Sequence, residues 1–186
     1  SENNWLGQGK KVGFNIDLSE ETLKGEVNYY DPNYDFLGNS LSYSLFSRSN
    51  DKPNQGYENT LVGGGLGTTF EQYENVFFSP ELSLSLEDLN TNSTASTQLK
   101  KQEGKYTDLY VNYSLNYDLR NSKYQPSSGY KTSFSQELPM VSDNNEISNT
   151  FIYTTYKTLN QSSDMIGKAS LFLKSVNSFD GSDVRI

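Results

Sequence analysis

Apolar side chains occupy every second position over unusually long stretches of this chain. Between residues 107 and 119 the apolar positions are Leu109, Val111, Tyr113, Leu115, Tyr117 and Leu119. The six residues that alternate with them are Asp108, Tyr110, Asn112, Ser114, Asn116 and Asp118, and all but Tyr110 are strongly polar. Successive side chains of a β-strand point to opposite faces, so this pattern predicts a strand with one apolar and one polar face. The same alternation recurs at residues 12–18 and 82–86, and helical spacing appears nowhere at length. The chain is therefore predicted to be all-β.

The number and length of these runs indicate the kind of sheet. About nine strands are expected, at residues 9–18, 22–30, 40–49, 57–70, 76–89, 105–119, 129–138, 147–159 and 165–176. Many exceed the roughly 5 to 6 residues that are typical of soluble sheets and match the roughly 9 to 11 that a tilted membrane strand needs. The lengths favour an antiparallel up-and-down transmembrane β-barrel, of which these 186 residues form one partial domain.

Composition excludes several classes of function. The chain has no Cys and no His, which removes disulfides, Cys nucleophiles, His-based triads and thiolate or imidazole metal sites. Neither catalysis nor a metal or cofactor is expected. A net charge of -8, without a basic cluster, argues against nucleic acid as a partner. No run approaches the roughly 18 to 20 apolar residues of a membrane helix, whereas the alternating strands of a barrel leave the mean hydropathy low.

Aromatic residues gather in alternate connectors between the expected strands. They cluster at Tyr29, Tyr30, Tyr34 and Phe36, at Phe70, Tyr73, Phe77 and Phe78, at Tyr117, Tyr124 and Tyr130, and at Tyr156, whereas connectors 19–21, 50–55, 90–104 and 140–146 are polar. Alternate turns of a meander lie on the same side, so the asymmetry is typical of an aromatic girdle at one membrane interface. The longest connector, residues 90–104, is predicted to be an extracellular loop, and the aromatic turns to be periplasmic.

The apolar positions of the strands are the candidate lipid-facing residues. They are Val12, Phe14, Ile16, Leu18, Leu41, Tyr43, Leu45, Leu82, Leu84, Leu86, Leu109, Val111, Leu115, Leu171 and Leu173. The polar positions would face a wet lumen in a barrel and bulk water in a sandwich, so polarity alone does not choose between these folds. Gly63, Gly64, Gly65 and Gly67 lack the Lys-Ser or Lys-Thr pair of a phosphate-binding loop and are expected to permit a bend or a close backbone approach.

Three segments resemble turns of the BamA family, the outer-membrane protein assembly factors, and they follow the family's order. Asn4, Trp5, Leu6, Gly7 and Gly9 resemble the turn that leads into the family's second barrel strand. Asp31 and Pro32, with Gly38, resemble the turn between its third and fourth strands. Pro126 and Gly129 resemble the Pro-x-x-Gly turn between its seventh and eighth strands, with Leu138-Pro139 closing the eighth. Val184-Arg185-Ile186 resembles the family's Arg-Gly-aromatic motif only superficially, because Ile stands in place of Gly.

The resemblance implies a place in a larger architecture and a function. Residues 1–186 would be the N-terminal part of the barrel, strands two to ten of sixteen, with the first strand, the closing strands and the periplasmic POTRA domains lying outside this segment. The implied function is that of an insertase in the outer membrane of a Gram-negative bacterium, which folds and inserts other outer-membrane proteins without catalysing a covalent reaction. Its implied partners are membrane lipid, unfolded outer-membrane protein clients and the lipoproteins of an assembly complex.

Two other classes of function stay open at the level of sequence. A passive porin with a constricting loop would share the two-faced strands and the girdle. A soluble β-sandwich binding module would share the polar faces. Within the BamA family, a relative that exports polypeptide or builds autotransporters also fits the sequence.

Overall fold

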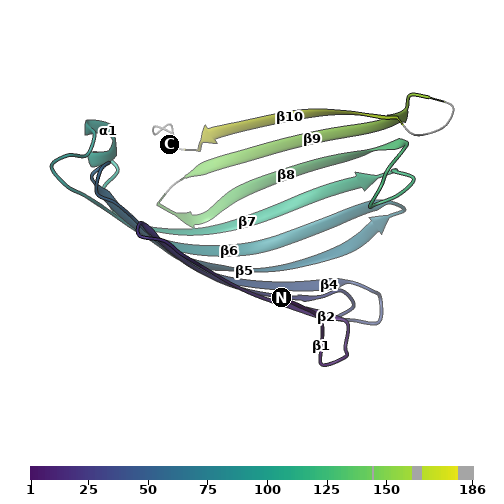
Figure 1. The fold of residues 1–186 in the computed structure, drawn as a ribbon, viewed down its shortest axis with the longest axis horizontal. Coiled ribbons are helices and arrows are strands. Elements are labelled where there is room, and N and C mark those ends of the chain that lie inside the picture. The colour runs from purple at the N-terminus through teal and green to yellow at the C-terminus, as the bar shows by residue number, and fades with distance from the viewer. Residues whose placement is uncertain (144, 161–164, 180–186) are drawn as a thin grey trace.

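Ten antiparallel strands form a single sheet in which every strand pairs with its neighbours in the sequence (Figure 1). The computed structural model describes residues 1–143, 145–160 and 165–179. The strands are β1 (Glu2–Trp5), β2 (Lys10–Leu18), β3 (Thr22–Asp31), β4 (Ser40–Lys52), β5 (Tyr57–Tyr73), β6 (Val76–Thr91), β7 (Gly104–Asp118), β8 (Gly129–Ser142), β9 (Glu146–Thr158) and β10 (Ile166–Ser178). The predicted all-β, up-and-down architecture is confirmed.

The nine expected strands correspond to β2 through β10, and two details of the prediction are wrong. A tenth strand, β1, precedes them, so Asn4 and Trp5 lie in a strand rather than in a turn. The expected end of β8 at Leu138-Pro139 is also wrong, because the strand continues to Ser142 past a bulge opposite Leu109 and Tyr110. A bulge accommodates Pro139, which has no backbone N–H to donate. Val184-Arg185-Ile186 lies outside the described residues.

The meander places alternate connectors at opposite ends of the sheet (Figure 1). We call the end with the β1–β2, β3–β4, β5–β6 and β7–β8 connectors the turn end, and the opposite end the loop end. The loop end carries α1 (Thr97–Lys100), a single turn whose N-cap is Ser96. No helix in the described ranges is long and apolar enough to span a membrane.

The sheet has almost no packed core. Among the described residues, Leu89 and Ala95 are the buried hydrophobic ones; Leu89 lies near the end of β6, and Ala95 lies in the connector between β6 and β7. Large apolar side chains such as Phe14 and Leu45 are 64% and 66% exposed. A soluble sandwich would cover one face with a second sheet, and the described residues form no second sheet. The sandwich alternative is therefore not favoured.

The centre of the sheet is packed too closely to accept a larger residue at Gly63. A Cβ atom built on Gly63 would lie 2.6 Å from the carbonyl oxygen of Leu84 and 2.6 Å from the ring of Phe46. The expected close backbone approach is therefore present at this position of β5.

We predict that Gly63→Ala destabilises the folded protein by about 1 to 3 kcal/mol, because the added methyl group must displace backbone atoms of β6. Gly25→Ala is the matched control, since nothing lies within 4 Å of the Cβ position at Gly25 in β3. Urea unfolding of both variants in phospholipid vesicles measures the difference. A Gly63→Ala variant as stable as Gly25→Ala would contradict the packing argument.

Candidate functional site

The register of the strands gathers the apolar positions onto one face of the sheet. Directly paired residues of neighbouring antiparallel strands project to the same face. One such row runs through seven strands as Val12, Tyr29, Tyr43, Leu66, Leu82, Val111 and Leu138, and the next as Phe14, Val27, Leu45, Gly64, Leu84, Leu109 and Val141. All fifteen candidate lipid-facing residues lie on this surface, which we call the apolar face.

Aromatic rings line the apolar face toward the turn end. Phe70, Phe78, Tyr113 and Phe134 form a continuous cross-strand row with ring centroids 5.5, 5.9 and 6.3 Å apart. Tyr117, Tyr130 and Tyr153 form a second row, with spacings of 5.9 and 5.8 Å. Such pairs add roughly 0.5 to 1.5 kcal/mol each beyond their buried area. The aromatic turns of the sequence thus continue into ordered rows on the adjoining strands.

The opposite surface, the polar face, is held by hydrogen bonds between strands. Asn112 Nδ2 donates to Ser83 Oγ at 3.0 Å, and Asn59 Nδ2 donates to Glu87 Oε1 at 2.9 Å. Asn112 stands in register between Glu81 on β6 and Glu137 on β8. No group of three or more acidic residues in the described ranges is arranged to hold a metal ion.

A polar row crosses the apolar face, and the sequence pattern did not reveal it. Tyr113 Oη donates to Gln136 Oε1 at 2.8 Å, and Gln136 Nε2 donates to Asn149 Oδ1 at 2.5 Å. Gln136 breaks the alternation of β8, which was the available signal, but its partners lie 23 and 13 residues away and only the register identifies them. The mutual bonds offset part of the cost of placing these groups on an apolar surface.

All three family-like turns lie at the turn end. In the first, Asn4 Oδ1 accepts a hydrogen bond of 2.7 Å from Gly9 N. In the second, Asp31 is buried and lies 3.3 Å from Lys10 Nζ, so it joins the end of β3 to the start of β2. In the third, Gly129 has φ +94 and a Cβ there would lie 2.1 Å from the Leu119 carbonyl oxygen, so the position requires glycine. Pro126 lies in the same connector, and Gly38 in that between β3 and β4.

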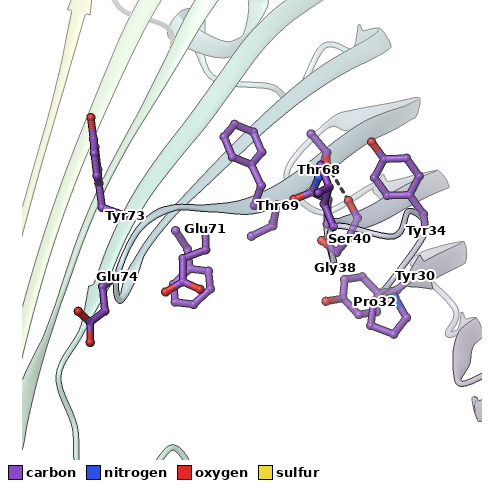
Figure 2. Close-up of a pocket in the computed structure, with 14 residues that line it drawn as sticks. Tyr30, Pro32, Tyr34, Gly38, Ser40, Thr68, Thr69, Glu71, Tyr73 and Glu74 are labelled. Carbon is purple, nitrogen blue, oxygen red and sulfur yellow. Dashed lines mark hydrogen bonds between the residues drawn. The ribbon is translucent and has the colours of Figure 1, made fainter.

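A pocket of about 1140 Å³ opens at the turn end between two connectors that are far apart in the sequence. Figure 2 shows Tyr73 and Glu74 on one side of the opening and Tyr30, Pro32 and Tyr34 on the other. Its lining residues are Tyr30, Pro32, Tyr34, Leu37, Gly38, Asn39, Ser40, Thr68, Thr69, Phe70, Glu71, Tyr73, Glu74 and Phe77. We call it the turn-end pocket. The sequence grouped these aromatic residues by connector, but it did not indicate that the two connectors lie opposite each other across a pocket.

Asp35 fixes the connector that forms one wall of the turn-end pocket. Its Oδ1 accepts from Leu37 N and from Asn39 N, both at 3.0 Å, and its Oδ2 accepts from Asn39 Nδ2 at 2.7 Å. Desolvation raises the pKa of the Asp35 carboxyl, but the bonds donated by Asn39, Leu37 and Gly38 outweigh it, and the net pKa shift is downward. The ionised carboxylate therefore stabilises this wall.

One apolar face, one polar face, aromatic rows and long meandering strands together define the wall of a β-barrel membrane protein. The Omp85 superfamily domain matches residues 4–186, and the chain belongs to the Omp85 superfamily. Its fold is similar to the crystal structure of BamA from Haemophilus ducreyi lacking POTRA domains 1-3, with a TM-score of 0.78 and 22% sequence identity. The match covers 98% of this chain and 38% of that chain. The predicted family resemblance is thereby confirmed at the level of the superfamily.

We predict that the Asp35 wall loosens as the pH falls. The pKa of Asp35 is lower in the folded state, so its stabilisation is complete above the unfolded pKa of about 4 and is lost as the pH falls through the folded value. Hydrogen exchange of the Leu37 and Asn39 amides, corrected for intrinsic rates, should accelerate below about pH 4. In Asp35→Asn, which keeps an acceptor but no charge, the corrected rates should not depend on pH, and an unchanged pH dependence would refute the assignment.

Proposed function

We propose that the apolar face contacts membrane lipid and that the polar face lines a water-filled lumen, in the outer membrane of a Gram-negative bacterium. The observation that carries this proposal is the pair of apolar rows that cross seven strands without a covering layer in the described part of the chain. Strands β4 through β10 have 13 to 17 residues. At about 3.3 Å per residue and a tilt of about 45°, they rise roughly 30 to 40 Å, enough to span a bilayer.

We further propose that the protein assists the folding and insertion of other outer-membrane proteins and catalyses no covalent reaction. Membership of the Omp85 superfamily and the fold of a BamA structure support this function. Its partners would be lipid, unfolded outer-membrane clients and assembly lipoproteins. The described sheet would be the N-terminal part of a barrel that further strands close, with POTRA domains preceding it.

A passive porin shares the two-faced wall, but the superfamily match does not favour it. Reconstitution separates the two functions. The complete gene product is placed in vesicles, a urea-unfolded outer-membrane barrel is added, and its folding is followed by heat-modifiable migration on gels. We expect folding faster than in empty vesicles. Free diffusion of small sugars without any acceleration of folding would instead identify a porin.

We predict that substitution by arginine destabilises the protein at only one of two neighbouring residues at the centre of β7. Val111→Arg should cost about 2 to 4 kcal/mol, because the charge would enter hydrocarbon. Asn112→Arg should be mild, since its neighbours in register are the carboxylates of Glu81 and Glu137. Urea unfolding in vesicles measures both variants. Similar losses at the two positions would contradict the two-faced wall.

We predict that the loop end is extracellular and the turn end periplasmic. Thr97 in α1 and Gln125 between β7 and β8 are both exposed, and the chain has no natural Cys to interfere. In intact cells a membrane-impermeant thiol reagent should label Thr97→Cys and spare Gln125→Cys, and both should react after lysis. The reverse pattern would invert the orientation.

A further inference from the structure

We propose that the turn-end pocket binds an extended polypeptide segment that carries cationic and apolar side chains. The inference rests on the proposed function, because an insertase binds its clients as unfolded chains. It adds the chemistry by which the turn end of the sheet would bind such a chain. Neither the superfamily match nor the turn motifs assign a role to this pocket.

The size of the turn-end pocket suits a polypeptide rather than a small molecule. Its volume of about 1140 Å³ exceeds the roughly 300 to 1,000 Å³ of small-molecule sites. Both walls are held in place before any ligand arrives. Asp35 fixes the connector between β3 and β4 through three hydrogen bonds, and Glu71 Oε1 accepts a bond of 2.7 Å from Asn75 N in the tight β5–β6 turn. A preformed site loses less entropy on binding.

The lining of the pocket is aromatic, with negative charge and no positive charge. Its charged residues are Glu71 and Glu74, and no Lys or Arg lines it. Glu71 already accepts from a backbone N–H, whereas Glu74 makes no hydrogen bond or ion pair within the described ranges. In Figure 2 Glu74 lies beside Tyr73 on one side of the opening, and Glu71 lies between that side and Tyr30 and Tyr34. Charge complementarity therefore selects a cationic ligand.

The protein's own lysines show that these rings accept ammonium groups. Lys11 Nζ lies 5.8 Å from the ring centroid of Tyr30, and Lys123 Nζ lies 5.8 Å from that of Phe77. Both rings belong to the pocket, while both lysines lie outside its lining. Tyr34 and Tyr73 present further aromatic surface without a lysine. A segment that alternates cationic and apolar residues matches this arrangement of rings and carboxylates.

The test uses the complete gene product in amphipol and a fluorescein-labelled hexapeptide, Lys-Tyr-Lys-Ser-Lys-Tyr, with a counterpart in which Glu replaces each Lys. Fluorescence anisotropy measures binding. We expect the lysine peptide to bind at least tenfold more tightly than the glutamate peptide, and its affinity to fall with added salt because the contacts are partly ionic. Equal binding of the two peptides, or none, would overturn the proposal.

Variants locate the site. Glu71→Gln combined with Glu74→Gln removes both charges, keeps an acceptor for Asn75, and should weaken the lysine peptide at least tenfold. Glu58→Gln, on the same strand at the loop end, is the matched control and should bind as the unmodified protein does. Unchanged affinity in the double variant would refute the site. The client-folding assay on the same preparations separates the two proposals. Faster client folding without peptide binding would support the insertase function and refute the peptide site. Peptide binding without faster client folding would support the peptide site and refute the insertase function.

Discussion

Hydrogen bonding between neighbouring antiparallel strands is the interaction on which this structure depends. Most folded domains rely on a packed core, but here Leu89 and Ala95 are the buried hydrophobic residues of the described ranges. The continuous pairing of β1 through β10 determines everything else, because it sets which side chains share a row. A slip of one residue would move every apolar side chain of a strand to the polar face. The aromatic rows, the polar row and the turn-end pocket are all consequences of one register.

The sequence was informative wherever a property repeats along one strand. Alternation located β2 through β10 and assigned Val12 and Val111 to the same face, because both inferences need only local period-two geometry. It failed at β1, whose four residues are too few for a period to be visible. It also ended β8 too early at Pro139, because a bulge that accepts proline is decided by the partner strand.

The functional features that the sequence missed all require knowledge of the register or of the connectors. Gln136 is one polar residue in the alternation of β8, and only the pairing with β7 and β9 places Tyr113 and Asn149 beside it. The turn-end pocket joins residues 30–40 to residues 68–77, and no local pattern shows that these segments face each other. The family-like turns were found because each is a compact motif, with its hydrogen bonds among residues close in the chain.

The unequal strand lengths have a consequence for the depth at which the wall leaves the lipid. β5 has 17 residues and β2 has 9, a difference of 8, so β5 is longer by about 26 Å at roughly 3.3 Å per residue. Toward the loop end, the apolar face becomes polar across β4 to β7 at one row, Ser49, Thr60, Asp88 and Lys105, in which Lys105 and Asp88 pair at 3.4 Å, whereas β3 and β2 keep Leu23 and Leu18 in the same row. With lipid on the apolar face, as proposed, this row marks the edge of the hydrocarbon layer at β4 through β7. β6 continues three residues past Asp88 to Thr91 before the connector that carries α1, so in the proposed arrangement α1 lies outside the hydrocarbon layer.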